Sequence, residues 1–174
     1  TPVYEVARIL HKYGAIACFD FAASGPYVKI DMNHDSDAYF DAVYLSPHKF
    51  LGGPGASGVL VFNKKIYDQS LPPTFAAGGT VDFVNPINVD YTEDIETREK
   101  AGTPGILQTI RASLAINLKE HIGQEKIEKI EVDYCKRALT RLKKISNIEI
   151  LGNLDPKNRI PIISFLIKHD DRYL

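Results

Sequence analysis

The stretch "DAVYLSPHKFLGGPGASGVLVF", residues 41–62, decides the fold. It contains two short apolar runs, "AVYLS" (42–46) and "SGVLVFN" (57–63), whose β-branched and aromatic residues are typical of buried strands. Between the runs, a serine, a histidine and a lysine stand directly before a glycine-rich loop. Lysine is seldom buried without a partner, so Lys49 is either an ordinary solvated loop residue or part of a reactive centre.

The composition limits the classes of function. The 174 residues suffice for one domain with a core, or for a piece of a larger protein. A balance of 21 basic and 22 acidic residues gives a net charge of −1, which does not favour a nucleic-acid partner. No apolar run approaches the about 20 residues of a membrane span, and no signal peptide opens the chain. The two cysteines are far apart and have no metal-binding spacing, so we expect a reduced, cytoplasmic protein without a metal.

The segments around the opening stretch complete an α/β pattern. Thr1-Pro2 predicts the start of a helix, with the threonine as its cap, and Gly14 predicts its end. The run "AIACFDFA" (15–22) predicts a second buried strand, which contains Asp20. Residues 64–103 are rich in Pro, Gly, Asn and Thr, so we expect loops there.

The second half of the chain is predicted to be mainly helical. A helical pattern runs from Pro104 to Lys144, with a break at Gly123. Its apolar face before the break is predicted to consist of Ile106, Ile110, Leu114 and Leu118. Two strands are expected after it, at 147–151 and 160–169, separated by a turn at Asp155-Pro156.

Asp20 and the turn after residue 46 are the candidates for chemistry. A carboxylate beside apolar residues loses hydration, which favours a cationic partner such as a protonated ring nitrogen. A turn-capping role for Asp20, through Ser24 or Gly25, is the alternative. In open parallel sheets, ligands gather at the carboxyl ends of strands. A lysine partly desolvated there has a lowered pKa and forms a Schiff base readily, while Ser46 and His48 suit a phosphate.

Four stretches together resemble the class V aminotransferases, the group that contains cysteine desulfurases and selenocysteine lyases. They are "CFDFAASGPYVKIDM", "DAVYLSPHKFLGGPGASGVLVF", "AAGGTVDFV" and "REKAGTPGILQTIRASLAI". The resemblance spans most of residues 1–150, and its most specific part is the Ser-x-His-Lys turn followed by glycines. It implies an α/β protein of fold type I, with a mainly parallel sheet in the large domain, and pyridoxal 5'-phosphate as cofactor.

The resemblance also implies roles for single residues. Lys49 would be the catalytic residue and the covalent attachment point of the cofactor, and Asp20 would pair with the pyridinium nitrogen. Ser46 and His48 would contact the phosphate. A further group would lie near the cofactor of the neighbouring subunit in a homodimer, and consists of Thr103 together with the loop residues Gly78, Gly79 and Thr80. The ordinary alternative for Thr103 is a helix cap before Pro104.

Some features of these relatives are missing. They usually carry glutamine or histidine three residues after the aspartate, where this chain has Ala23, which donates no side-chain hydrogen bond. The reactive cysteine and the arginine that grips the substrate carboxylate would lie outside the chain, so no substrate-binding arginine is assigned. The remaining candidates are expected to be core cysteines, solvated or interface arginines, and surface or packing histidines: Cys18, Cys135, Arg98, Arg111, His11, His34, His121 and His169.

Three functional hypotheses follow. The first is a pyridoxal-phosphate enzyme acting on an amino acid as a desulfurase, lyase or transaminase, with this chain as its central piece. Residues 1–103 would then belong to the large cofactor domain, 104–145 to a connecting helix, and 146–174 to the start of a small domain. The second is a non-catalytic fragment that cannot bind the cofactor by itself. The third, a serine hydrolase using Ser46 and His48, lacks the sequence pattern of a nucleophile elbow.

Overall fold

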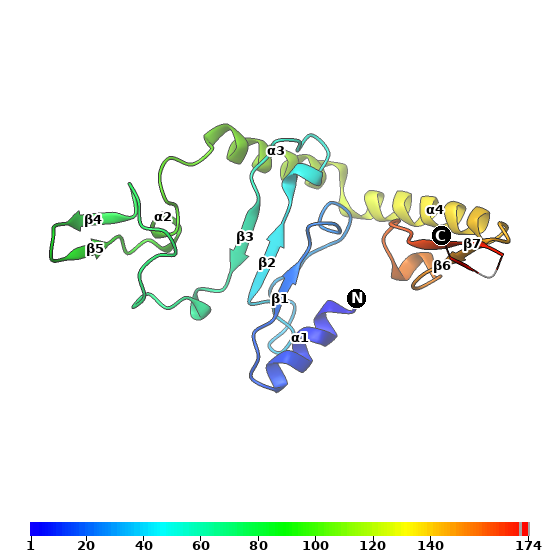
Figure 1. Ribbon diagram of the computed structural model, residues 1–174, viewed down its shortest axis with the longest axis horizontal. Helices are drawn as coiled ribbons and strands as arrows, with labels where there is room; N and C mark the ends of the chain where they lie inside the picture. Colours follow the sequence, from blue (N-terminus) through cyan, green and yellow to red (C-terminus); the bar gives the residue numbers. More distant parts are fainter. Residues whose placement is uncertain (171, 174) are drawn as a thin grey trace.

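The computed structural model describes residues 1–170, 172 and 173. The chain is elongated (Figure 1), with a three-stranded sheet at its centre, a β-hairpin on one side, and a helix with a second small sheet on the other. One helix crosses the upper end of the central sheet and joins the two sides.

The central sheet has the order β1–β2–β3, with β1 at Cys18–Asp20, β2 at Ala42–Leu45 and β3 at Val59–Phe62. β1 is parallel to β2, and Asp20 lies opposite Tyr44. β3 is antiparallel to β2. The α/β class is confirmed, but the pairing is mixed: residues 46–58 contain no α-helix that crosses over the sheet, and the chain returns antiparallel beside β2.

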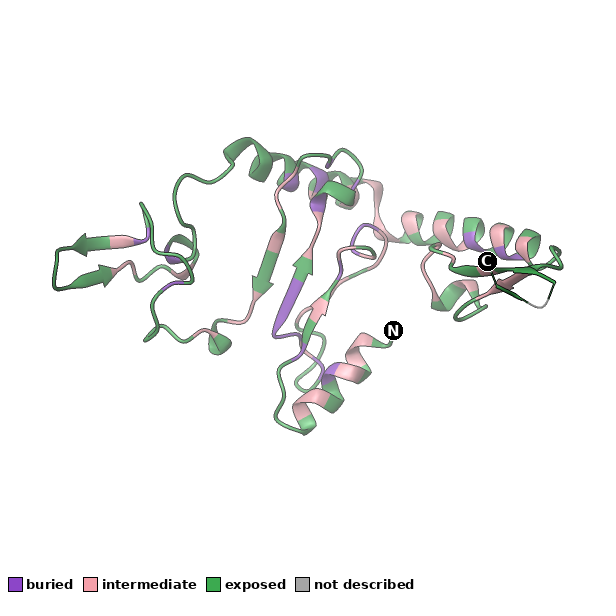
Figure 2. Ribbon diagram, in the orientation of Figure 1, coloured by how far each residue is buried: buried purple, intermediate pink, exposed green. Residues whose placement is uncertain are grey.

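The core lies between β1–β2 and the helix α1 (Val3–Lys12), which covers one face of the sheet. Its buried residues are Ala7, Ala17, Phe21, Phe40 and Val43. The Phe40 ring stacks on Tyr4 with centroids 5.0 Å apart and meets Phe19 at 4.7 Å. Figure 2 shows this burial concentrated on β2 and the adjacent loops.

The predicted end of α1 is confirmed, and its predicted cap is wrong. Its N-cap is Pro2, which has no side-chain cap hydrogen bond, so the prediction of Thr1 as cap is wrong. The helix ends before Gly14, whose φ of 69° is the left-handed conformation that glycine adopts without strain.

The face of the sheet opposite α1 is open. Tyr44 and Leu60 lie opposite each other there and are 47% and 51% exposed. Cys18 and Asp20, on the edge strand β1, are exposed too. The predictions of a buried strand over 15–22 and of a core Cys18 are therefore wrong, because no described element covers β1 on this face. Cys135 is fully buried, as predicted.

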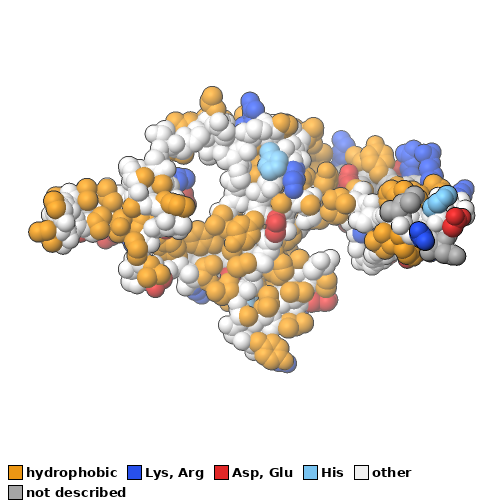
Figure 3. Space-filling view, in the orientation of Figure 1, with side chains coloured by type: hydrophobic (Ala, Val, Ile, Leu, Met, Phe, Trp, Pro, Cys, Tyr) orange, Lys and Arg blue, Asp and Glu red, His pale blue; other side chains and the backbone are white. Residues whose placement is uncertain are grey.

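Residues 64–103 contain more structure than expected. The elements are the 3-10 helix η2 (Lys64–Ile66), the antiparallel strands β4 (Val81–Val84) and β5 (Val89–Tyr91), and the short helix α2 (Ile95–Arg98). Arg98 is buried and donates to the carbonyl oxygens of Gln69 and Leu71 at 3.1 and 2.6 Å. Of the two expectations for Arg98, a solvated charge is wrong, because its guanidinium satisfies carbonyls that the loop leaves unpaired, and an interface role stays a prediction. Apolar side chains remain exposed over the hairpin (Figure 3).

The long helical pattern forms α3 (Ile106–Ile122) and α4 (Gln124–Leu142), and the predicted break at Gly123 is confirmed by its φ of 89°. The predicted apolar face of α3 is wrong, since Ile106, Ile110 and Leu114 are at least half exposed. Ala112 and Ala115 form the buried side instead.

The last part of the chain forms a small antiparallel sheet. Its elements are β6 (Ile148–Ile150), the 3-10 helix η3 (Pro156–Asn158), β7 (Phe165–His169) and β8 (Arg172–Tyr173). Both predicted strands are present, although β7 begins five residues later than the expected 160. Within the described residues, no helix has the length and apolar character needed to cross a membrane, and no group of side chains is suited to hold a metal ion.

A histidine joins α1 to the start of β2. His11 Nε2 lies 2.9 Å from the Asp41 carboxylate, and Nδ1 lies 2.9 Å from the Asp37 carbonyl oxygen. Both partners accept hydrogen bonds, so both ring nitrogens are best protonated. Burial lowers the pKa of His11, but the bonds to Asp41 and Asp37 outweigh it and raise the pKa above its ordinary value. Asp41 also accepts from the Ala17 amide at 2.8 Å, which ties the helix to the sheet.

We expect the free energy of unfolding to fall as pH rises above neutrality. Because the folded pKa of His11 is raised, its stabilisation is complete below about pH 6.5, the unfolded value, and is lost as pH rises through the folded pKa. Urea unfolding at a series of pH values from 5.5 to about 8.5 measures this slope. The His11→Phe variant should lose it. His34→Phe, at a histidine that only stacks on Tyr4, is the control and should keep it. Equal slopes in His11→Phe and the unsubstituted protein would contradict the assignment.

Candidate functional site

The parallel pairing of β1 with β2 brings the candidate residues to one edge of the sheet. Asp20 is the last residue of β1, and its neighbour Tyr44 stands two residues before Ser46. The 3-10 helix η1 (Pro47–Lys49) follows at once and carries His48 and Lys49. Parallel strands end on the same side, so the carboxylate and the Ser-x-His-Lys turn emerge at the same edge.

Asp20 has a specific local role that leaves half of its carboxylate free. Its Oδ1 accepts a hydrogen bond from the Ala22 amide at 2.7 Å, which closes a turn directly after β1. Asp20 thus caps a turn, as the alternative interpretation predicted, but its partner is Ala22 and the predicted partners, Ser24 or Gly25, are wrong. Oδ2 has no hydrogen-bond partner among the described residues, so Asp20 keeps one oxygen for a ligand.

The turn presents its polar side chains outward. The Lys49 amide donates to the Ser46 carbonyl at 2.9 Å, and the buried Pro47 and Phe50 anchor the turn from below. The side chains of Ser46, His48 and Lys49 form no hydrogen bond or ion pair with the described residues. His48 and Lys49 are exposed, so the predicted partial desolvation of the lysine is wrong for the described part of the chain.

Gly53 holds the turn in place because the backbone folds back onto Pro47. A Cβ atom on Gly53 would lie 1.8 Å from the Pro47 carbonyl oxygen, closer than any real contact. The Gly53 amide donates to Phe50 at 2.9 Å. Only glycine fits there, so the glycine loop after Lys49 is required by packing as well as by any ligand.

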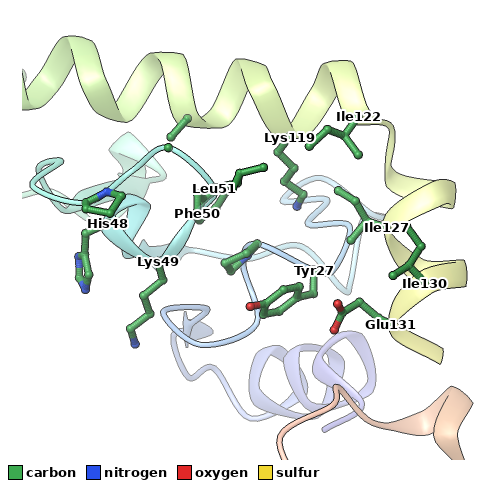
Figure 4. Close-up of a pocket in the computed structure, with 14 residues that line it drawn as sticks. Tyr27, His48, Lys49, Phe50, Leu51, Lys119, Ile122, Ile127, Ile130 and Glu131 are labelled. Atoms are coloured by element: carbon green, nitrogen blue, oxygen red, sulfur yellow. The ribbon is translucent and has the colours of Figure 1, made fainter. Parts of the chain in front are cut away.

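A hollow of about 550 Å³ borders Lys49 on one side (Figure 4). Its walls come from the turn at 48–54, from Pro26 and Tyr27, and from the facing parts of α3 and α4. Lys119 reaches from α3 toward the loop that contains Tyr27, and Glu131 lies on the α4 side. Lys49 lines this hollow, whereas Asp20 and Ser46 do not.

The second group of candidates lies beside the β4–β5 hairpin, separate from the turn at Lys49 (Figure 1). The Gly102 amide donates to the Gly78 carbonyl at 3.0 Å, so the loop at 78–80 and the segment before Thr103 are neighbours. Gly79 is exposed, with φ of 89° and open space around it.

Thr80 and Thr103 differ in how their side chains are placed. Thr80 is buried, and its hydroxyl both donates to the Ala77 carbonyl at 2.8 Å and accepts from the Ala77 amide. Its side chain therefore shapes the loop. Thr103 is exposed, and the N-cap of α3 is Gly105, so the prediction of Thr103 as a helix cap is wrong.

The sequence as a whole matches the family model described as "Aminotransferase class-V", over residues 1–173. The chain belongs to the class V aminotransferase family. The resemblance first seen in the Ser-x-His-Lys turn thus extends over nearly the entire chain.

Two similar proteins are both named probable cysteine desulfurases. The chain is 34% identical over 167 residues to a probable cysteine desulfurase of Halalkalibacterium halodurans, covering 96% of this chain and 39% of that protein. It is 36% identical over 148 residues to a probable cysteine desulfurase of Staphylococcus aureus strain Mu50, covering 85% and 34%. The chain therefore spans somewhat over a third of the length of these relatives.

Solved structures confirm the fold. The apo cysteine desulfurase from Thermococcus onnurineus superposes with a TM-score of 0.82 at 28% identity, over 94% of this chain and 40% of that one. A cysteine desulfurase from Escherichia coli gives a TM-score of 0.80 at 19% identity, over 94% and 39% of the two chains, and supports the fold alone. The chain thus has the α/β fold of fold type I enzymes, as predicted.

The residues at the sheet edge suit the cofactor of such enzymes. Pyridoxal phosphate needs an amine for its aldehyde, a carboxylate for its ring nitrogen and donors for its phosphate. Lys49, Asp20, Ser46 and His48 have these groups, and each retains at least one atom without a protein partner among the described residues. The observed donor set therefore fits the group.

Sequence reasoning missed Lys119 and Gln124, which contact the loop after β1. Lys119 donates to two carbonyls of that loop, and Gln124 donates to the Tyr27 carbonyl at 2.7 Å. A signal was present, because Ala112, Ala115 and Lys119 recur at helical spacing, which places a lysine on the buried side of α3. This signal was overlooked because the larger apolar residues on the other side of α3 were predicted to form its buried face.

We expect Gly53→Ala to destabilise the protein by about 3 kcal/mol or more, since the new methyl group collides with backbone rather than with a mobile side chain. Gly58→Ala is the matched control in the same loop. Its Cβ would lie 3.9 Å from the nearest atom, so a change within about 0.5 kcal/mol is expected. Chemical unfolding of both variants measures the difference. A Gly53→Ala protein as stable as Gly58→Ala would contradict the packing described for this turn.

Proposed function

We propose that this chain belongs to a pyridoxal-phosphate-dependent enzyme that acts on an amino acid, with cysteine as the first substrate to test. The observation that carries the proposal is the gathering of Asp20 with Ser46, His48 and Lys49 at one edge of the β1–β2 pair, where each has a polar atom with no partner among the described residues. The names of the relatives at 34% and 36% identity support cysteine as the substrate.

Each residue at the edge has a proposed task. Lys49 would hold the cofactor through Nζ, and its amine would also serve as the general base that moves a proton at the substrate's α-carbon. Asp20 Oδ2, which has no partner among the described residues, would accept a hydrogen bond from the protonated ring nitrogen. Ser46 and His48 would hold the phosphate through Oγ and a ring N–H. When bound, the cofactor supplies an electron sink for charge that develops on the substrate.

Ala23 stands where the relatives usually have a glutamine or histidine that can donate a hydrogen bond to the cofactor. The side chain at this position donates no hydrogen bond, and Ala23 is exposed beyond the turn that Asp20 closes with Ala22. The ring oxygen of the cofactor would therefore find its donor elsewhere. A backbone amide or another part of the full-length protein can fill this role.

We also propose that the enzyme is a homodimer in which Thr103 and the loop Gly78–Thr80 approach the neighbouring subunit's cofactor. The hydrogen bond between Gly102 and Gly78 supports a shared role for the two segments, and their separation from the Lys49 turn agrees with action on another subunit. Thr103 offers an exposed hydroxyl, Gly79 an accessible backbone, and Thr80 stabilises the loop. The division into a large-domain part (1–103), a connecting helical part (104–145) and the start of a small domain (146–174), and a cytoplasmic location, stay predictions from the sequence.

The test of the cofactor site uses the full-length protein. Borohydride makes the bond between pyridoxal phosphate and a lysine permanent, so mass spectrometry should find the added group on the peptide that contains Lys49. We expect Lys49→Ala to lose nearly all of this labelling, because Lys49 is the amine that the proposal assigns to the cofactor's aldehyde. Lys64→Ala, at an exposed lysine in the 3-10 helix η2, is the matched control and should label as the unsubstituted protein does.

Equal labelling of the Lys49→Ala protein would overturn the proposal. The alternative, a fragment that cannot bind cofactor by itself, is tested separately by titrating the 174-residue chain with pyridoxal phosphate. Saturable binding of one cofactor per chain excludes it, and absence of binding alongside labelling of the full-length protein supports it.

The dimer proposal predicts complementation between two inactive full-length variants. Lys49→Ala lacks the amine of its own site, and Thr103→Val lacks the hydroxyl that we assign to the neighbouring site. A hybrid dimer then contains one intact site. An equal mixture unfolded and refolded together should regain about a quarter of the unsubstituted activity, measured as alanine formed from cysteine in the presence of a thiol reductant, because half of the dimers are hybrids.

The same mixture distinguishes the two placements of Thr103. If Thr103 serves its own subunit, no site in the hybrid is intact and the activity stays at the average of the two parent variants. That outcome would contradict the assignment of Thr103 across the interface.

A further inference from the structure

Lys119 occupies a position on α3 that suits an apolar residue. It follows Ala112 and Ala115 on the buried side of the helix, and it is itself only partly exposed. Burial lowers the pKa of Lys119, with a smaller opposing contribution from Glu120. A lysine in such a position is costly unless its ammonium finds acceptors, so its contacts need an explanation.

The Lys119 ammonium finds its acceptors in the loop that follows β1. Nζ donates to the carbonyl oxygens of Gly25 and Val28, both at 2.7 Å. It also lies 5.8 Å from the centre of the Phe50 ring, within the range of a cation–π contact. Figure 4 shows the side chain descending from α3 between these segments. One charged group therefore touches the loop after Asp20 and the residue directly after Lys49.

The loop that Lys119 contacts has little conformational freedom. The Gly25 amide donates to the Phe21 carbonyl at 2.6 Å, and the Tyr27 and Val28 amides donate to Ser24. A Cβ atom on Gly25 would lie 2.8 Å from the Phe21 oxygen and 3.5 Å from the Phe50 ring. The loop is thus packed between the end of β1 and the base of the turn that carries Lys49.

The start of α4 is also hydrogen-bonded to this loop. Gln124 Nε2 donates to the Tyr27 carbonyl at 2.7 Å, only five residues along the chain from Lys119. The break at Gly123 turns the chain so that both side chains reach carbonyls of one loop. The junction of α3 and α4 is therefore tied to the sheet edge by three hydrogen bonds to backbone carbonyls.

We propose that Lys119 is a positioning residue, which fixes the end of β1 that carries Asp20 relative to the turn that carries Lys49. This role rests on the proposed function, since it concerns the alignment of the two groups that would hold the cofactor. Lys119 acts through the carbonyls of Gly25 and Val28 and through the Phe50 ring, and it does not touch the reacting atoms.

The first measurement asks whether the tie exists. Amide hydrogen exchange is measured without cofactor in the unsubstituted full-length protein and in its Lys119→Met variant. Methionine keeps the length of the side chain and removes its hydrogen-bond donors. We expect the amides of Gly25, Tyr27 and Val28 to exchange about tenfold faster or more, because two charge-assisted hydrogen bonds are lost. Lys126→Met, at an exposed lysine of α4, is the control and should leave these amides unchanged.

The second measurement asks whether the tie positions the cofactor groups. With pyridoxal phosphate bound, the absorbance of the Lys49-linked cofactor is titrated with pH. A shift in the midpoint of at least about 0.5 pH unit is expected in Lys119→Met, since the alignment of Asp20 with Lys49 changes. Lys119→Arg, which keeps donors in reach of both carbonyls, should restore most of the original midpoint, and Lys126→Met should not shift it.

The outcomes separate this inference from the proposed function. Unchanged exchange in Lys119→Met overturns the tie, and faster exchange with an unchanged midpoint overturns the positioning role. If Lys119→Met does not fold, Lys119→Leu, which also removes the donors and suits the buried side of α3, takes its place with the same two criteria. If the unsubstituted protein binds no cofactor, the proposed function fails and the positioning role with it, while the exchange data still decide whether the tie exists.

Discussion

The parallel pairing of β1 with β2 is the constraint on which the rest of the candidate site depends. The Phe21 amide donates to the Tyr44 carbonyl at 2.9 Å just beyond the end of β1, and Asp20 lies opposite Tyr44 in the ladder. This register brings a carboxylate from one strand and a Ser-x-His-Lys turn from the other to one edge. In an antiparallel pair the two ends would lie at opposite edges, and the same residues would form no site.

Packing explains why this edge can be both rigid and accessible. α1 and the rings around Phe40 bury one face of the sheet, while the face that carries Asp20 and Tyr44 stays open. The turn at Lys49 has buried residues on both sides of its exposed pair, and Gly53 locks it by close backbone packing. The polar side chains are thus presented by an ordered scaffold, which is what a cofactor site requires.

The junction of α3 and α4 extends this scaffold across a large distance in sequence. Lys119 and Gln124 hold the loop at 25–28, more than 90 residues earlier in the chain. Arg98 has a similar role near the hairpin, where it satisfies carbonyls of Gln69 and Leu71. In both places a long cationic or amide side chain replaces an apolar core, because loops leave carbonyls that need donors.

The sequence by itself determined the α/β class, the break at Gly123, the resemblance to class V aminotransferases and the candidate site residues. These features depend on local patterns: apolar runs, glycine conformation and a short, specific motif. Tertiary structure decided which faces are covered. It exposed Cys18 and the large apolar residues of α3, buried Arg98, formed the β4–β5 hairpin in an apparent loop, and placed Lys119 against carbonyls far away in sequence. Burial and hydrogen-bond partners depend on what packs against a residue, and a local pattern contains no information about that neighbour.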